Sequence, residues 1–211
     1  MSLFDLRKEY RQGEVSKDST DDCPFAQFKL WFEEYKAATP GEPNVMSLAT
    51  ATKAGDPSVR LVLLKDFSKK GFTFFTDYNS RKGRELEENP KAALVFFWEV
   101  QGRQVRINGV VEKLSRKEST EYFHSRPKGS QVAASVSSQS QEIENREAFI
   151  NRWQKSLKDL EDKEVPCPDN WGGYRVIPKE FEFWQGRPNR LHDRICYSLD
   201  KKSWKKVRRQ P

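Results

Sequence analysis

The chain has 211 residues, a length that suits one domain with a sizeable core, and its 12% aromatic content argues against disorder. The net charge of +7 would suggest nucleic-acid binding, but residues 201–211 hold six Lys or Arg, which leaves 32 basic against 31 acidic residues in the first 200. We therefore expect a soluble globular protein that binds no nucleic acid. The basic end is more typical of a short solvated strand than of a contact for an anionic partner.

Targeting and redox signals are also missing from the sequence. No apolar run approaches the length of a membrane span, and residues 1–15 alternate charges where a signal peptide would be apolar. Cys23, Cys167 and Cys196 are widely spaced, so we expect neither a disulfide framework nor a zinc site. These features predict a cytoplasmic protein without membrane contact. We expect residues 1–22 to form a polar, mobile segment and residues 23–211 to form a single domain.

The first predicted element is a helix, and short strands follow it. Aromatic residues recur at helical spacing in residues 25–38. Beyond them, turns containing Gly and Pro separate short apolar runs, a pattern that favours antiparallel hairpins. We expect a short helix opened by Ser80 and a bulge near Gly109. The strands of this part are expected at residues 45–51, 58–67, 72–78, 91–100 and 103–114.

Helices and then strands are expected in the second half. The helices cover residues 115–125, 129–139 and 146–163, and the last carries an apolar stripe that we expect in the core, Phe149, Trp153, Leu157 and Leu160. Strand character returns at residues 174–178, 180–186, 193–199 and 203–207. Because no linker separates the two groups of strands, we expect a mainly β fold with helices (α+β), in which one antiparallel sheet system closes into a barrel.

The sequence lacks the familiar catalytic signatures, but it contains three pairs of basic residues, which we call basic islands. The chain has no G-x-G-x-x-G, no P-loop, no H-E-x-x-H and no G-x-S-x-G. Arginine forks around phosphate oxygens, and a helix N-terminus adds oriented amide groups. Each island alone is more typical of a solvated cap or a surface ion pair, but together they favour a phosphorylated ring ligand. The islands are Arg60 with Lys65, Arg81 with Lys82, and Arg126 with Lys128.

The segment "FWQGRPNRLHDR" (residues 183–194) adds three arginines, a tryptophan and one of two histidines. With the other motifs of the chain, it resembles the pyridoxine 5'-phosphate oxidase family over nearly the full length and in unbroken order. "FWQG" followed by "NRLHDR" is the most specific part of this resemblance. The other matching segments are "RKEY" (7–10), "RLVLLK" (60–65), "FFTDYNSRKG" (74–83), "RQVRING" (103–109), "YFHSRPKGSQ" (122–131), "SSQS" (137–140) and "WGGY" (171–174).

The resemblance implies an antiparallel FMN-binding split β-barrel with peripheral helices, assembled as a homodimer with FMN at the interface. It implies that Arg81 and Lys82 hold the FMN phosphate. The full set of implied cofactor contacts is Arg60, Leu61, Val62, Leu63, Phe75, Thr76, Arg81, Lys82, Gln104, Gln139, Ser140, Trp184 and Arg194.

The resemblance also implies a substrate site. Arg190 and His192 would be the catalytic positions, with Leu191 between them, and alternation along a regular strand would place Arg190, His192 and Arg194 on one face. His124 is outside this set, so we expect it to serve helix packing. The substrate phosphate would be held by Lys65, Tyr122, Arg126 and Ser130, and the bound substrate covered by Arg7, Lys8, Glu9 and Tyr10.

The implied reaction is oxidation of pyridoxine or pyridoxamine 5'-phosphate to pyridoxal 5'-phosphate, with hydride transfer from C4' to flavin N5 and reoxidation by O2 to give H2O2. His192 is the titratable candidate for the substrate proton, whereas Arg190 is a poor base. A split-barrel flavoprotein with another substrate and a carrier of pyridoxal 5'-phosphate are the alternatives. The family usually ends in Arg-Leu-Ala-Pro, and this chain ends in "RRQP", so we expect its terminal packing to differ.

Overall fold

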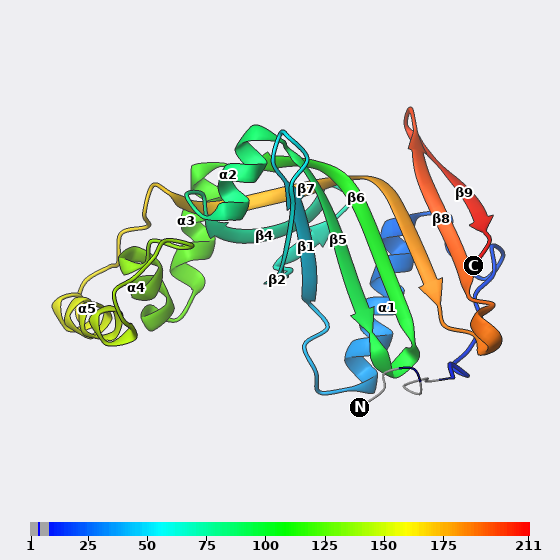
Figure 1. The fold of residues 1–211 in the computed structure, drawn as a ribbon, viewed down its shortest axis with the longest axis horizontal. Coiled ribbons are helices and arrows are strands. Elements are labelled where there is room, and N and C mark those ends of the chain that lie inside the picture. The colour runs from blue at the N-terminus through cyan, green and yellow to red at the C-terminus, as the bar shows by residue number, and fades with distance from the viewer. Residues whose placement is uncertain (1–3, 5–8) are drawn as a thin grey trace.

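Nine antiparallel strands form one curled sheet in the part of the chain that the computed structural model describes, residue 4 and residues 9–211 (Figure 1). The strand order is β2-β1-β5-β6-β7-β4-β3, with β8 added to β7 and β9 added to β8. The strands are β1 Val45–Ala51, β2 Pro57–Leu63, β3 Asp66–Ser68, β4 Gly71–Asp77, β5 Lys91–Trp98, β6 Arg103–Lys113, β7 Trp171–Gln185, β8 Asp193–Asp200 and β9 Ser203–Arg209.

Strand β7 is where the sheet divides into two parts. It pairs with β6 along nearly its whole length, while residues 171–176 pair with β4 and residues 180–185 pair with β8. The two predicted strands at 174–178 and 180–186 are therefore one continuous strand, because pairing with β6 continues past Pro178. A long strand shared by two sheet halves is what splits the barrel, and the predicted fold class is confirmed.

The predicted bulge near Gly109 is present. The β6–β7 register shifts between Asn108 and Gly109, opposite Pro178. A Cβ at Gly109 would lie 2.2 Å from the carbonyl oxygen of Ile177, so the close approach of the two backbones requires glycine at this position.

The single strand predicted at residues 58–67 is wrong, because the chain bends between β2 and β3. The amide of Leu64 donates to Asn44 O at 2.8 Å, and the amide of Lys65 donates to Thr73 O at 2.8 Å. The backbone thus changes partners within two residues. As a result, Leu64 is buried in the core and Lys65 is exposed.

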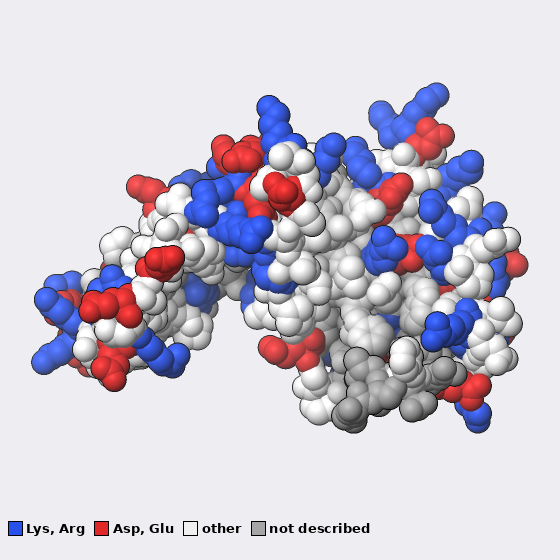
Figure 2. All heavy atoms as spheres, in the orientation of Figure 1, with Lys and Arg blue, Asp and Glu red and all other residues white. Residues whose placement is uncertain are grey.

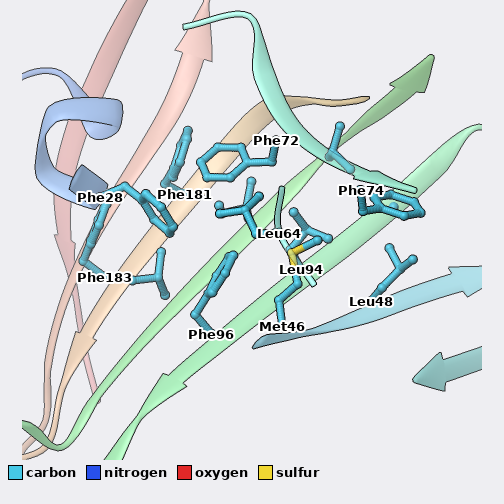
Figure 3. Close-up of a cluster of buried hydrophobic side chains, with 14 of the residues drawn as sticks. Phe28, Met46, Leu48, Leu64, Phe72, Phe74, Leu94, Phe96, Phe181 and Phe183 are labelled. Carbon is cyan, nitrogen blue, oxygen red and sulfur yellow. The ribbon is translucent and has the colours of Figure 1, made fainter. Parts of the chain in front are cut away.

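The main core lies between the sheet and helix α1, Pro24–Ala38, which begins at a proline in its first turn (Figure 1). Phe28 and Trp31 face the sheet, and the ring of Phe28 lies 4.9 Å from Phe72 and 5.0 Å from Phe96. In Figure 3 the buried side chains of α1, β1, β4, β5 and β7 point toward one another. This aromatic core holds the strands that carry the site.

The remaining helices lie at one end of the sheet (Figure 1). They are α2 Arg81–Glu88, α3 Arg116–Ser125, α4 Lys128–Val136 and α5 Arg146–Asp159. Two short 3-10 turns connect strands: η1, Glu99–Gln101, lies between β5 and β6, and η2, Pro188–Arg190, lies between β7 and β8. A second apolar cluster joins Phe123, Val132, Val165 and Trp171. No helix in the described ranges is long and apolar enough to cross a membrane.

The prediction that the stripe of α5 lies in the core is wrong. No residue of α5 is fully buried, since this helix packs mainly against α4 and leaves its other sides in solvent. Trp153, Leu157 and Leu160 are partly buried against the second cluster, and Phe149 lines a cavity instead.

Candidate functional site

A cavity of about 790 Å³ opens between β2, β4, α2 and the helices that follow α3. Ten of the predicted cofactor contacts line it, together with three of the four residues predicted to hold the substrate phosphate. They are Arg60, Leu61, Val62, Leu63, Phe75, Thr76, Arg81, Lys82, Gln139 and Ser140, and Lys65, Tyr122 and Arg126. Residues from segments far apart in the sequence therefore meet at one place, as the resemblance implied.

The start of α2 supplies buried positive charge to this cavity. Ser80 caps the helix by accepting from the Gly83 amide at 3.3 Å, and Lys82 is 8% exposed. The Nζ of Lys82 donates to three neutral oxygens, those of Gln139 at 2.8 Å, Thr76 at 3.1 Å and Ser80 at 3.2 Å. Burial, and next Arg60, lowers the pKa of Lys82 to about 8. Figure 2 shows Lys and Arg side chains gathered over α2.

Two arginines flank Lys82, and both meet the buried carboxylate of Glu85. Arg81 donates its Nε to Glu85 Oε1 at 2.9 Å, one helical turn along α2. Arg60 donates its Nη1 to Leu48 O at 3.0 Å, and its Nη2 lies 3.4 Å from Glu85 Oε2. The spacing "RKGRE" in the sequence was the signal that could have placed Glu85 in this set.

The opposite wall of the cavity is aromatic. The rings of Phe75 and Tyr122 stack at 3.8 Å, and Trp171 continues the stack 5.5 Å from Phe75. The guanidinium of Arg126 lies 4.8 Å from the Trp171 ring centre. Its Nη2 donates to Ser130 O at 2.9 Å, while its buried Nη1 has no hydrogen-bond partner among the described residues. Ser130 itself does not line the cavity.

A second cluster of predicted residues lies on the other half of the sheet. Gln104 pairs with Trp184, which pairs with Arg194, across β6, β7 and β8. Arg194 donates to Glu182 at 2.6 Å and to Gln210 O at 2.9 Å, and the bond to Glu182 raises its pKa. No member of this cluster lines the cavity. One chain therefore carries the predicted cofactor contacts in two separate groups.

The second cluster also contains His192 and Tyr10. The His192 ring lies 4.6 Å from Trp184, and Tyr10 meets Trp184 edge-on at 5.5 Å. Gly186 makes room for Tyr10, since a Cβ there would lie 2.4 Å from the tyrosine ring. The Arg187 amide donates to His192 Nδ1 at 3.1 Å, so the neutral imidazole carries its proton on Nε2. Burial, and next Arg190, lowers the pKa of His192.

The expected alternation of Arg190, His192 and Arg194 on one strand face is wrong. Residues 188–190 form the turn η2, and β8 begins only at Asp193. Arg190 adopts a left-handed backbone conformation with φ 60°, as does Ser140 in the cavity wall with φ 69°. Backbone strain of this kind is concentrated at functional sites. Arg190 therefore lies in a turn before β8 and not on the strand face that carries Arg194.

Several remaining predictions have simple outcomes. Leu191 is 66% exposed, and Glu9 pairs with Arg11, while Arg7 and Lys8 lie outside the described residues. His124 Nε2 lies 3.1 Å from Val165 O, which confirms its packing role. The sequence interpretation did not predict that Trp171 and Phe149 line the cavity. Both are aromatic residues in sequence patterns that are typical of a hydrophobic core.

Comparison with known proteins places these features in a family. Residues 32–154 match the family described as pyridoxamine 5'-phosphate oxidase, and residues 171–211 match the pyridoxine 5'-phosphate oxidase C-terminal dimerisation region. Proteins named pyridoxine/pyridoxamine 5'-phosphate oxidase from Nostoc punctiforme and Trichormus variabilis are 55% and 53% identical, over 100% of this chain and 99% of each relative.

Solved structures agree with this assignment. PhzG from Burkholderia lata 383, solved in complex with tetrahydrophenazine-1-carboxylic acid, is 31% identical and superposes with a TM-score of 0.90 over 97% of this chain and 100% of its own. A pyridoxamine 5'-phosphate oxidase-related, FMN binding protein from Nostoc punctiforme is 15% identical, with a TM-score of 0.70 over 90% of this chain and 98% of its own, and it supports the fold alone. The chain belongs to the pyridoxamine 5'-phosphate oxidase family, a family of FMN-binding oxidoreductases.

Proposed function

We propose that this protein oxidises pyridoxine 5'-phosphate and pyridoxamine 5'-phosphate to pyridoxal 5'-phosphate with FMN as cofactor, in the cytoplasm. The observation that carries the proposal is a pair of cations in one cavity, Lys82 and Arg126, neither of which forms an ion pair with any described carboxylate. A cation that has lost water without gaining an anion is unfavourable, so each position favours a phosphate ligand. Two phosphate positions suit one phosphorylated cofactor and one phosphorylated substrate.

The residues at the start of α2 fit the phosphate of FMN. Lys82 would give its ammonium protons to phosphate oxygens, and Arg81 would add a guanidinium at the cavity mouth. The capped helix N-terminus orients backbone amides toward the same place. The half-exposed to exposed β2 residues Leu61 to Leu63 would lie along the flavin ring, as the resemblance implies.

The aromatic wall fits the phosphate of the substrate. Arg126 has a buried, unpartnered Nη1 and is held by Trp171 and by Ser130 O, so it is already oriented before any anion arrives. Lys65 and Tyr122 line the same cavity and would add an ammonium and a hydroxyl donor. Ser130 contributes through its carbonyl contact with Arg126, and a hydroxyl contact with the phosphate remains a proposal.

When bound, FMN would supply the hydride acceptor for this oxidation, with O2 as the final electron acceptor and H2O2 as its product. The alcohol substrate loses one hydrogen from C4' and one from its hydroxyl, giving the aldehyde. The amine substrate consumes water in addition and releases ammonia. The residues of this chain would hold the ring and phosphate of the substrate in place, and orientation of this kind lowers a reaction barrier by up to about 7 to 11 kcal/mol.

We further propose that each complete site is built from two chains. The cavity of one subunit would meet the second cluster of its partner, bringing Gln104, Trp184 and Arg194 to the flavin and Arg190 and His192 to the substrate. Two features support this arrangement: the second cluster lies apart from the cavity in a single chain, and residues 171–211 match a dimerisation region. Arg7 to Tyr10, of which Tyr10 packs beside His192, would then cover the substrate.

Purified protein tests this function directly. We expect a yellow protein, or one that FMN turns yellow, and formation of H2O2 and aldehyde in equal amounts when pyridoxine 5'-phosphate is added in air. Unphosphorylated pyridoxine is the control and should react far more slowly, since it cannot engage Arg126. Binding of pyridoxal 5'-phosphate without turnover would favour the carrier alternative, and flavin without B6 turnover would favour another substrate.

A further inference from the structure

A carboxylate lies beside the cations that the proposed function assigns to the FMN phosphate. Glu85, on α2, has a side chain only 4% exposed. Its Oε2 accepts from the hydroxyls of Ser58 at 2.5 Å and of Thr50, while its Oε1 accepts from Arg81 Nε. Burial raises the pKa of Glu85, but the hydrogen bonds from Ser58, Thr50 and Arg81 outweigh it and lower the pKa to about 2. The group is therefore an anion at any physiological pH.

If only its charge mattered, the Glu85 carboxylate would weaken the binding of a phosphate at this site. A phosphate bound at Arg81 and Lys82 would be repelled by an anion in the adjoining wall, so removing Glu85 should strengthen phosphate binding if nothing else changed. What opposes this expectation is the geometry of the hydrogen bonds that Glu85 makes.

Glu85 fixes Arg81 in a particular way. It takes the Nε of that guanidinium, whereas neither Nη donates to another described residue. Arg81 is 59% exposed, so without this anchor its long side chain would sample many rotamers in solvent. With the anchor, the free end of the guanidinium is presented at the cavity.

Glu85 also holds Arg60 and Arg81 close to one another and to Lys82. Burial, and next Arg60, lowers the pKa of Lys82, and burial, with a smaller effect of Arg81, lowers that of Arg60, so like charges lie close together in this wall. An anion bonded to both arginines reduces that repulsion while leaving Lys82 without a carboxylate partner. The cations stay assembled, and the position facing the cavity stays open.

We infer that Glu85 is a positioning residue for the FMN phosphate clamp: it orients Arg81 and Arg60 from behind, and its loss weakens phosphate recognition although it removes a negative charge. This inference rests on the proposed function, because it takes Arg81 and Lys82 as the FMN phosphate contacts. Glu85 touches neither ligand itself in this arrangement.

The test compares apoprotein affinities for FMN and for riboflavin, which has the same ring system and no phosphate. We expect Glu85→Ala to lower FMN affinity about tenfold and to leave riboflavin affinity unchanged, so that the preference for FMN shrinks. Glu85→Gln, which keeps an oxygen acceptor for Arg81 Nε, should recover most of the preference. Glu87→Ala is the matched control: it removes the same charge from α2, where Glu87 pairs with Lys113 at 2.5 Å on the surface, and should change neither affinity.

The outcomes separate the inference from the function on which it rests. An unchanged or increased preference for FMN in Glu85→Ala would overturn the positioning role, and equal losses for FMN and riboflavin would mean that Glu85 only maintains the fold. Wild-type protein that binds riboflavin as tightly as FMN would instead overturn the placement of the FMN phosphate.

Discussion

We predict that Lys82 makes the binding of FMN depend on pH. Its pKa is about 8 in the absence of ligand, because burial and Arg60 disfavour the ammonium. A bound phosphate dianion stabilises the charged form and raises this pKa, so binding takes up a proton wherever the free side chain is neutral. FMN affinity should therefore be constant between about pH 7 and pH 8 and fall by up to about tenfold per pH unit above pH 8.

Titration of apoprotein with FMN over about pH 7 to pH 10 measures this dependence, since the phosphate of FMN is already a dianion above its second pKa of about 6. Riboflavin is the control for effects on the ring, and its affinity should lack the decline. Lys82→Arg stays charged throughout and should flatten the FMN curve. An FMN affinity that is flat in the wild type would exclude Lys82 from the phosphate site.

We predict that His192 acts as a hydrogen-bond donor and not as a base. Its Nδ1 accepts from the Arg187 amide, so neutral imidazole presents Nε2–H to a ligand, and protonation would direct a second N–H against that amide. This geometry narrows the role suggested by the sequence, in which His192 was the candidate for the substrate proton. Activity should need the neutral ring, and since the pKa of His192 is lowered, kcat/KM should fall only below the usual histidine range.

Substitutions of His192 distinguish a role as a hydrogen-bond donor from a role as a general base. We expect His192→Ala to reduce kcat by about 10- to 100-fold, the range of one hydrogen bond to a charged group, with flavin still bound. His192→Gln, which offers an amide N–H, should retain more activity and lose the acidic limb of the pH profile. Equal damage by both substitutions would favour the base, and loss of flavin in His192→Ala would contradict a role at the substrate.

At the level of elements, local sequence patterns predicted most helices and strands. The predicted bounds were wrong for strands whose limits depend on partners distant in the sequence. β1, residues 45–51, has the predicted bounds, and α2 begins after its Ser80 cap as expected, because alternation and capping are local signals. The break after Leu63 depends on Asn44 and Thr73, and the continuity of β7 across Pro178 depends on β6. Neither partner can be read from the segment itself.

The bulge between β6 and β7 makes Gly109 a test of how tightly the split sheet is packed. A Cβ there would meet the backbone of Ile177, which cannot move aside as a flexible side chain would. Gly109→Ala should lower the free energy of unfolding by about 1 to 3 kcal/mol, measured by denaturant titration. Gly129→Ala is the control, because its Cβ would meet Trp153 at an ordinary 3.4 Å, and its effect should stay within about 1 kcal/mol. Equal effects of the two would mean that the bulge tolerates a side chain.

At the level of the whole molecule, the resemblance to a family named the candidate site residues, but it did not indicate their division into two groups. Motif order along the chain says nothing about which residues lie in one cavity. Strand pairing decides that: β2 and β4 carry Arg60 and Thr76 to the cavity, and β6, β7 and β8 carry Gln104, Trp184 and Arg194 elsewhere. Residues that contact the cavity-lining side chains from the other side, such as Glu85, can be identified only from the packing of side chains in the structure.

A dimer with shared sites makes a prediction that a self-contained subunit does not. Arg126→Ala damages the cavity and His192→Ala damages the second cluster, so each variant alone should have low activity. In a mixed dimer, one site combines both defects, and the other combines the intact cavity of one chain with the intact cluster of its partner. Subunit exchange between equal amounts of the two variants should restore about a quarter of wild-type activity, because half of the dimers are mixed and each has one intact site. If both groups served a site within one chain, every site would carry a defect, and mixing would restore nothing.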